Sequence, residues 1–470
     1  MYPEWVTKHR RKGTNISCIN GKYYLYAVAS VWNREKGRAQ MVNKGYLGRI
    51  TEKGFVPKED KYPKIETPVN VKEFGATNVL YEISADIRER LERTFGCDGL
   101  TVYAIALMRL LNNCPFKRVE LCYRHSFLSE LLPSLRLSGK DISGFLRSFG
   151  EDRGKISGFM TGTIGEGCHI LFDGTSIVSD SEKMKINRLG YNAHKGFAAQ
   201  INLMYAFSQD EKAPAYYRVI PGNVRDVVAF KLSVEESGIS NAVIIADKGF
   251  GSEANFSLLE KNNLQYIVPL RRNNSLINYT KLKITDRSAF DGYFMHENRP
   301  IWYYTSDGIM LFLDTELRAD EEKSYLQNVK SNTDGYTMEA FYQKQFAFGT
   351  IAIKTNMSVT PVEVYALYKQ RREIEQAFDF LKNLLEQDKT FMQNEKSLET
   401  WAFINHISLI LCYKVYNLLR DKKVISKYSV ADFLEHLKYI SKVKIGTQWA
   451  TSEIVKTSRD LLAELNLHIT

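Results

Sequence analysis

Two short apolar runs, each followed by an aspartate, constrain the fold of this chain more than any other feature of its sequence. The runs at 170–172 and 243–246 precede Asp173 and Asp247. Continuous apolar runs of this length are typical of strands that are buried on both faces, as in α/β domains. Helical and strand patterns alternate around the second run, so we predict an α/β domain with a mixed sheet.

The hydrophobic pattern also predicts an interruption of this domain. From 273 to 354 the helical pattern disappears, and segments such as 293–304 and 336–343 have the composition of strands. Helical patterns return at 361–385 and 398–419. We therefore predict a mostly β insertion between two parts of one α/β domain.

Positive charge is concentrated near the amino end. The 470 residues carry a formal net charge of +10. Residues 1–58 hold twelve lysines and arginines against three glutamates, which is nearly the whole excess. This distribution suits either a solvated basic surface or a module that binds nucleic acid. Strand-like patterns in the same residues predict a small basic β-rich unit.

The cysteines and the apolar segments indicate the compartment. The six cysteines form no CxxC pair, which favours a reducing compartment and argues against a zinc site. The first residues have no apolar core of the kind that a signal peptide needs. The most apolar stretch, 401–419, is interrupted by polar residues such as Asn405 and Lys414, so we expect a buried helix and not a membrane span. We expect a cytoplasmic protein with no membrane partner.

Asp173 and Asp247 stand at the carboxyl ends of their apolar runs, where ligands bind in an α/β sheet. A carboxylate at this place must be solvated, paired or bound to a metal. Either aspartate alone would suit a turn or a helix cap. Two aspartates on strands of one sheet favour a functional pair.

The helix that follows the insertion adds a third carboxylate. At about 100° per residue, four polar side chains fall within an arc of roughly 60° on one face, and these are Tyr368, Arg371, Glu375 and Lys382. Ordinary ion pairs between residues four apart on an amphipathic helix are the alternative interpretation. Asp379 competes with Glu375 for the role of third carboxylate.

Three carboxylates that converge from two strands and a helix would form a site rich in oxygen. Mg²⁺ and Mn²⁺ prefer such hard ligands. Two of these ions, about 3.5–4 Å apart, would stabilise the attacking and leaving oxygens of an in-line displacement at phosphorus. The expected reaction is the cleavage or transfer of a phosphodiester, with the tyrosine, arginine and lysine of the helix holding phosphates.

These residues resemble the DDE transposases of bacterial insertion sequences, in the group marked by Tyr-x2-Arg-x3-Glu-x6-Lys. The helix matches this signature with no error of spacing. The segments 170–175 and 244–250 match the family around its two aspartates, and 221–226 is also similar to it. The resemblance extends from about 168 to 419, and a weaker likeness reaches the basic strands near the amino end.

The resemblance implies a ribonuclease-H-like fold with a mostly β insertion between the second aspartate and the glutamate. It implies that Asp173, Asp247 and Glu375 bind the divalent metal ions, and that the other signature residues grip phosphates of the transposon end. In some relatives a tryptophan of the insertion stacks on a flipped base. Trp302 is the only tryptophan in this insertion, so it either takes that role or belongs to the core. Lys248 either contacts phosphate or is an ordinary exposed turn residue.

The patterns and the resemblance together divide the chain into six expected regions. These are a basic β-rich unit at 1–75, a helical DNA-binding region at 76–155, the first part of the ribonuclease-H-like catalytic domain at 160–272, the β-strand insertion at 273–354, the catalytic helix at 355–395 and a C-terminal helical region at 396–470.

The leading hypothesis is an active transposase that binds terminal inverted repeats, cleaves the ends of its element and joins them to target DNA. Such chemistry needs two double-stranded DNA ends, so we expect a dimer in the DNA complex. Two other hypotheses stay open at this point. One is a catalytically silent DNA-binding regulator derived from a transposase, and the other is a stand-alone nuclease with the same metal chemistry.

Overall fold

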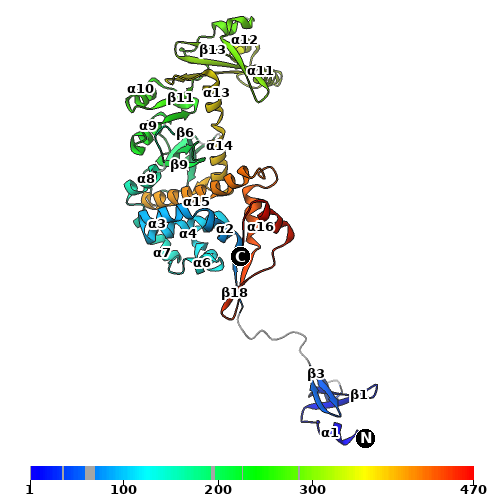
Figure 1. Cartoon of the computed structure of the whole chain (residues 1–470). Coiled ribbons are helices and arrows are strands. Elements are labelled where there is room, and N and C mark those ends of the chain that lie inside the picture. Colours follow the sequence, from blue (N-terminus) through cyan, green and yellow to red (C-terminus); the bar gives the residue numbers. More distant parts are fainter. Residues whose placement is uncertain are drawn as a thin grey trace. The chain divides into compact units, whose positions relative to one another are not determined.

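The computed structural model describes residues 2–33, 36–58, 69–162, 164–191, 196–224, 226–283 and 286–469. It divides into two compact units (Figure 1). The first consists of Met1–Val69 with Ile445–Gln448, and the second of Asn70–Lys444 and Trp449–Thr470. Arg225, which belongs to the segment that is similar to the family, lies outside the described residues.

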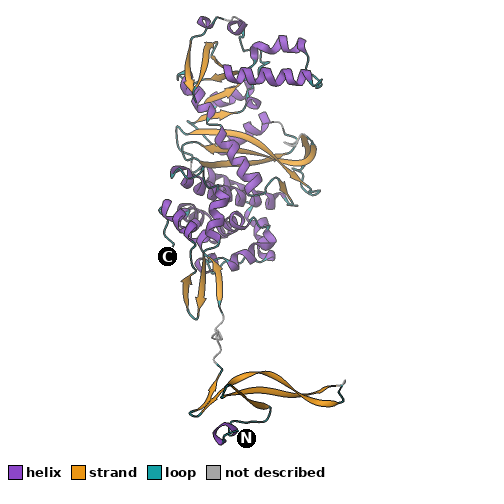
Figure 2. Ribbon diagram, turned by 90° about the vertical axis from the view of Figure 1, so that its right-hand side faces the viewer, coloured by secondary structure: helices purple, strands orange, loops and turns teal. Residues whose placement is uncertain are grey.

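The amino-terminal unit is an antiparallel sheet with one short helix. Its elements are α1 (Glu4–Thr7), β1 (Thr14–Ile19), β2 (Lys22–Asn33), β3 (Arg38–Thr51) and β4 (Gly54–Pro57), with the strands in that order in the sheet. Val6, Ile16, Leu25 and Ile50 form its small core. β2 and β3 continue beyond this core as a two-stranded ribbon (Figure 2). The predicted β-rich character of this unit is confirmed.

The second unit begins with helices that pack against a long helix from near the end of the chain. The elements are β5 (Asn70–Glu73), α2 (Gly75–Ile83), α3 (Ala85–Phe95), α4 (Cys97–Asn112), η1 (Phe116–Arg118), α5 (Val119–His125), α6 (Leu128–Leu131), α7 (Gly139–Phe149), α8 (Arg153–Thr161) and α15 (Glu395–Asp421). The Ser408 hydroxyl of α15 donates to the backbone oxygen of Ala106 in α4 at 3.1 Å. By length and composition α15 could cross a membrane, but 78% of its most apolar window is buried inside the protein. The prediction of a buried helix at 401–419 is therefore confirmed.

A mixed sheet of eleven strands forms the centre of this unit. Its strands are β6 (His169–Ser179), β7 (Arg188–Tyr191), β8 (Phe197–Ser208), β9 (Ala213–Pro221), β10 (Val243–Ala246), β11 (Gln265–Pro269), β12 (Gly292–His296), β13 (Arg299–Ser306), β14 (Ile309–Asp314), β15 (Thr350–Thr355) and β16 (Lys389–Thr390). The order is β12-β13-β14-β15-β11-β10-β6-β8-β7, with β9 also on β8 and β16 on β6.

The middle of this sheet has the α/β character that the sequence predicts. β6, β10 and β11 are parallel to one another, whereas β8 is antiparallel to β6 and β9 is antiparallel to β8. α9 (Asp226–Ser237) and α10 (Glu253–Lys261) connect the strands around β10. The predicted α/β domain with a mixed sheet is confirmed.

The insertion is not mostly β, which corrects the prediction. β12 to β15 extend the sheet from β11, but α11 (Thr315–Lys330) and α12 (Met338–Lys344) lie between β14 and β15. Most of the segment 336–343, which we expected to be a strand, is α12. The hydrophobic pattern does not reveal α11, because this helix is largely polar and buries only Tyr325, so it has no apolar stripe.

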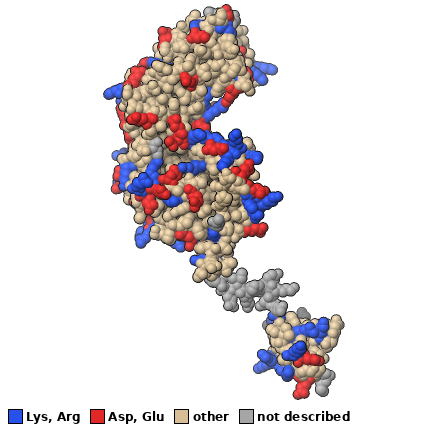
Figure 3. Space-filling model, in the orientation of Figure 1, with Lys and Arg blue, Asp and Glu red and all other residues tan. Residues whose placement is uncertain are grey.

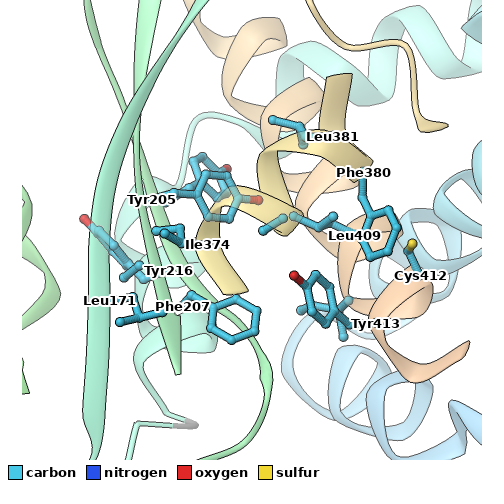
Figure 4. Close-up of a cluster of buried hydrophobic side chains, with 14 of the residues drawn as sticks. Leu171, Tyr205, Phe207, Tyr216, Ile374, Phe380, Leu381, Leu409, Cys412 and Tyr413 are labelled. Carbon is cyan, nitrogen blue, oxygen red and sulfur yellow. The ribbon is translucent and has the colours of Figure 1, made fainter. Parts of the chain in front are cut away.

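The helix that carries the signature is interrupted, although the sequence predicts one continuous helix. It consists of α13 (Pro361–Lys369), α14 (Arg372–Asp379) and the π-helical segment η6 (Phe380–Leu384). Figure 4 shows Ile374, Phe380 and Leu381 from these segments among buried side chains of the sheet and of α15. The Tyr413 hydroxyl of α15 donates to the backbone oxygen of Glu373 at 2.9 Å. These contacts fix α14 against the sheet.

The C-terminal region contains two strands, which the sequence does not predict, besides its helices. It contains α16 (Val430–Lys438), β17 (Ser441–Ile445), β18 (Gln448–Thr451) and α17 (Lys456–Glu464). β17 pairs with β18 and with β5 in a three-stranded sheet. The local sequence does not predict these strands because the partner that stabilises β17 lies hundreds of residues earlier in the chain.

Candidate active site

Asp173 and Asp247 lie side by side on neighbouring parallel strands. Phe172 of β6 is paired with Ala246 of β10, so the next residue of each chain segment is an aspartate. Asp247 follows the end of β10, as the sequence predicts. Asp173 does not end its strand, which corrects that part of the prediction. β6 continues to Ser179 because β8 supplies an antiparallel partner along this stretch.

Neither aspartate acts as a helix cap in the residues that the structure describes. The Oδ1 atom of Asp173 accepts a hydrogen bond from the backbone nitrogen of Gly174 at 2.8 Å, within a strand. Asp247 precedes the short 3₁₀ helix η2 (Lys248–Phe250), but its side chain makes no capping hydrogen bond there. Both carboxylates are therefore available for the interactions of the site.

The third carboxylate, Glu375, lies in the first turn of α14, just after the break in the helix. α13 ends at Lys369 and α14 begins at Arg372, so Gln370 and Arg371 form the junction. Ile374 in α14 is fully buried. Glu375 therefore stands at the border of the core, with 60% of its side chain exposed. The spacing of apolar residues in the sequence predicts this border position.

Arg371 joins all three carboxylates. Its Nη1 atom donates to Asp247 Oδ1 at 2.8 Å, and its Nη2 atom donates to Glu375 Oε1 at 3.0 Å and to Asp173 Oδ2 at 3.3 Å. The side chains of Arg371 and Asp173 are only 16% and 19% exposed. The rigid fork of a guanidinium suits several carboxylate partners at once. The i, i+4 ion pair that was the alternative interpretation exists, but it is one part of a larger cluster.

Asp379, the alternative third carboxylate, has other partners. It accepts hydrogen bonds from the side-chain amides of Gln376 at 3.3 Å and Asn383 at 2.6 Å. Among the described residues it makes no ion pair with Arg371. Of these two carboxylates, Glu375 is the one that shares Arg371 with Asp173 and Asp247.

Burial and crowding shift the pKa values of the cluster. Burial raises the pKa of Asp173 to about 6, from an ordinary value of 3.8, although Arg371 lowers it and the other two carboxylates raise it further. Burial lowers the pKa of Arg371, but its carboxylate neighbours, Asp173 first, more than offset this and the pKa is raised. Burial also raises the pKa of Tyr368, so its phenol remains a hydrogen-bond donor.

The other two signature residues surround the carboxylates. Tyr368, near the end of α13, interacts with the side chain of Arg371. Lys382 lies in η6 and is half-buried. Burial lowers the pKa of Lys382, and Asp388 and Asp173 act in the opposite direction, so Asp173 is within electrostatic reach. The structure thus brings the whole signature to one place.

Trp302 and Lys248 are not part of this cluster. Trp302 lies in β13 of the insertion, where its ring packs on Phe290 and Tyr293. It has no hydrogen bond or ring contact with the three carboxylates in the part of the chain that the structure describes. Lys248 follows Asp247 directly and its side chain is exposed.

A pocket beside Lys382 is the feature that the sequence did not lead us to expect. It has a volume of about 610 Å³, and its walls include Gly174, Asn202, Gly222 and Lys382. Gly222 permits a close approach, because a Cβ atom there would lie 2.0 Å from the backbone oxygen of Gln200. Gly222, within the family-like segment 221–226, is the only signal of this pocket in the sequence.

The donor set fits Mg²⁺ or Mn²⁺ in its chemistry. Three carboxylates surround one cationic group, and oxygen ligands of this kind suit hard divalent ions. As the side chains stand, the described residues contain no group of three His, Cys, Asp or Glu that could hold a metal ion. The guanidinium of Arg371 lies between the carboxylates. Binding of a metal ion here therefore requires Arg371 to move.

The sequence itself decides the family. The Transposase DDE domain matches residues 164–411, which is more than half of the chain. The chain belongs to the DDE-domain transposases. It is thus an enzyme that cleaves and transposes DNA. Asp173, Asp247, Glu375 and the whole insertion of this transposase lie within the matched range.

The chain is also similar to a solved structure. A cryo-EM structure of a piggyBac transposase synaptic complex with hairpin DNA matches this transposase with 13% sequence identity and a TM-score of 0.39. The match covers 77% of this chain and 78% of that chain. A likeness of this size carries no argument about the site. No curated protein matches the chain.

Proposed function

We propose that this DDE transposase belongs to a bacterial insertion sequence, in the group with the Tyr-x2-Arg-x3-Glu-x6-Lys signature. It binds the terminal inverted repeats of its element, cleaves the DNA at the ends and joins them to target DNA. One observation carries the proposal. Asp173, Asp247 and Glu375 come from two adjacent strands and a helix and meet at Arg371, at 2.8 to 3.3 Å.

The layout of the catalytic domain is ribonuclease-H-like in this proposal. The strand order β9-β8-β6-β10-β11 supports it, with the first aspartate on the middle strand and the second directly after the end of its parallel neighbour. The insertion follows β11 and leads back to the helix that carries the glutamate. Strands hold both aspartates rigidly, so their carboxylates are preorganised for one arrangement.

Two divalent ions, Mg²⁺ or Mn²⁺, would be held by Asp173, Asp247 and Glu375. When bound, they supply Lewis-acid activation of the nucleophile and stabilise charge on the leaving oxygen. The ionisation and the accessibility of these carboxylates depend on the residues around them. The pKa of Asp173, at about 6, leaves this carboxylate ionised near neutral pH. Glu375 is mostly exposed, so its carboxylate is accessible to a DNA substrate.

The other signature residues hold the phosphates of the DNA. Arg371 presents a planar fork that matches phosphate oxygens, whereas Lys382 acts as a point charge. Burial keeps the phenol of Tyr368 protonated, so that it can donate a hydrogen bond to a phosphate beside them. In this proposal Lys248 contacts a phosphate next to Asp247. Trp302 contributes to holding the cleaved end from the insertion.

Double-stranded DNA is the partner in this proposal, both as transposon ends and as target. The basic amino-terminal unit supports it, since phosphate neutralisation by lysine and arginine supplies much of the affinity for DNA. Joining two ends needs two active sites, so the DNA complex contains a dimer. The enzyme acts on chromosomal or plasmid DNA in the bacterial cytoplasm.

The test is metal-dependent cleavage and strand transfer on DNA that carries the element's own ends. Glu375→Gln keeps the size of the side chain and removes its charge. We expect it to abolish both reactions while end binding is retained. Asp379→Asn is the matched control, because it removes a carboxylate from the same helix that does not reach Arg371. This control is expected to keep both reactions.

Each other result points to a different function. A wild type that binds the ends but never cuts them would favour the silent regulator. Equal cleavage of DNA without inverted repeats would favour a stand-alone nuclease. Cleavage by Glu375→Gln at the wild-type rate would remove the triad from the mechanism.

A further inference from the structure

The amino-terminal sheet has one covered face. Side chains alternate between the two faces of a strand. Leu25 of β2 belongs to the core of this unit, and so does Ile16, which is paired with it on β1. Ile50 of β3 belongs to the same core and is paired with Tyr23. Because Val6 of α1 completes this core, α1 covers this face.

The opposite face has no cover from its own unit. It carries Tyr24 and Tyr26 of β2, which alternate with the core residues. The residues paired with them on β1 and β3 include Asn15, Tyr46 and Arg49. The ring of Tyr46 lies 5.9 Å from that of Tyr24 and 5.6 Å from that of Tyr26. We call this side of the sheet the open face.

The open face continues along the β2–β3 ribbon. Asn43 is paired with Val28, Met41 with Ser30, and Ala39 with Trp32. Trp32 and Met41 are 63% and 59% exposed. The Oδ1 atom of Asn43 accepts a hydrogen bond from the backbone nitrogen of Gly45 at 2.9 Å, which fixes the amide and leaves its nitrogen to donate outward.

The charge of the sheet complements a polyanion. None of its four strands contains an aspartate or a glutamate, whereas β2 and β3 contain Lys22, Arg38, Lys44 and Arg49. In the described part of this unit, no lysine or arginine forms an ion pair with an acidic side chain. Figure 3 displays lysine and arginine side chains on this unit.

We propose that the open face reads the sequence of the element's end in the major groove of DNA, with Asn43 and Arg49 as specificity residues. This inference rests on the proposed function. The stretch of β2 and β3 that carries Asn43 is two-stranded, and such a ribbon fits the major groove, which is about 12 Å wide. Arg49 lies where this ribbon joins the four-stranded sheet, paired with Tyr24 and with Val56 of β4. Arginine binds guanine through two hydrogen bonds and asparagine binds adenine. The exposed Trp32 and Met41 contact apolar parts of the groove, such as thymine methyl groups.

The opposite face of the same ribbon provides a matched control. Arg38 is paired with Asn33, and Gln40 with Val31. Arg38 and Gln40 therefore lie on the face of the ribbon that is continuous with the covered face of the sheet. Arg49→Ala with Asn43→Ala removes one arginine and one amide from the open face. Arg38→Ala with Gln40→Ala removes the same chemistry from the other face of the same two strands.

The experiment measures the affinity of the full chain by fluorescence anisotropy. The probes are a duplex with the terminal inverted repeat that flanks this reading frame and a scrambled duplex of equal composition. We expect the open-face variant to lose about 10-fold to 100-fold of the affinity ratio between the probes. The control variant keeps the ratio. Arg49→Lys keeps the charge but not the fork, so it lowers the ratio and keeps the slope.

Three results would overturn the inference. The ratio could survive in the open-face variant, or fall only in the control. The variant could also leave DNA binding unchanged and alter the mass measured by light scattering, which would make the open face a protein interface. A wild type that binds both probes equally instead contradicts end recognition, and so the proposed function itself. Thermal melts establish that each variant is folded.

Discussion

Asp173 must be ionised to hold a cation, yet its surroundings oppose ionisation. It is largely buried and has two other carboxylates nearby, and Arg371 compensates only in part. Its pKa of about 6 in the folded chain exceeds the ordinary value of 3.8. The folded chain therefore binds more protons than the unfolded chain between these values. Stability must fall as the pH rises through this window.

Asp173→Asn mimics the protonated form and should stabilise the protein above pH 6. At neutral pH the free energy of unfolding should increase by about 2–3 kcal/mol, and the gain should vanish towards about pH 4. Urea unfolding in a buffer with a chelator, from about pH 4 to pH 8, measures it. Asp379→Asn controls for the loss of a negative charge. A variant less stable than the wild type at pH 7 would contradict the argument.

Arg371 is the cation that the three carboxylates share, so its removal leaves them uncompensated. Arg371→Gln should lower the free energy of unfolding by about 3 kcal/mol without added metal ions. Mn²⁺ should raise the melting temperature of this variant more than that of the wild type, because no guanidinium competes with it. Arg372→Gln is the control: its side chain is exposed and its ion pair is long. It should change the free energy by less than about 1 kcal/mol. Equal Mn²⁺ shifts in both proteins would disprove the competition.

The spacing in the helix was enough to predict part of the site. Arg371 and Glu375 are four residues apart, which places them on one face of any helix. The reach of Arg371 to Asp173 and Asp247 was not predictable from the helix, because it depends on the register of β6 and β10 and on the break after Lys369. The periodicity of the local sequence predicts neither the register of β6 with β10 nor the break in the helix.

At the scale of elements, patterns fail where a distant partner stabilises the structure. Asp173 with Gly174 looks like a turn, but pairing with β8 keeps both residues in β6. α11 is polar on most of its surface, so a method that looks for an apolar stripe cannot find it. The apolar runs that precede Asp173 and Asp247 are predictable as strands because they are buried on both faces and hence apolar throughout.

Two glycines near α7 should respond in opposite ways to one substitution. A Cβ atom on Gly150 would lie 1.9 Å from the backbone oxygen of Lys396 in α15, whereas one on Gly144 would meet nothing within 4 Å. Gly150→Ala should therefore destabilise the packing of α7 on α15 by about 2 kcal/mol or more. Gly144→Ala should stabilise the protein by about 0.5–1 kcal/mol. Urea midpoints measure both, and a loss at Gly144 as large as that at Gly150 would contradict the steric argument.

At the scale of the whole molecule, segments far apart in the chain form the second unit together. α15 packs on α4, and β17 pairs with β5. The helix with Glu375 is in turn held by Tyr413 of α15. The helix with Glu375 thus depends on regions at both ends of this unit. No local pattern predicts such dependence, since it arises from interactions across hundreds of residues.

The concentration of positive charge in residues 1–58 predicts how their deletion affects DNA binding. Residues 1–58 carry twelve lysines and arginines against three glutamates, in a chain whose net charge is +10. Their removal leaves a nearly neutral chain, so DNA affinity should fall and its salt slope should drop by several units, at about 0.9 unit for each phosphate that is no longer neutralised. The rest should keep its melting temperature, because the removed unit has its own core in Val6, Ile16, Leu25 and Ile50. Anisotropy between about 50 and 200 mM salt measures the slope. An unchanged affinity and slope would show that the basic unit is a solvated surface and that the remaining chain holds the DNA.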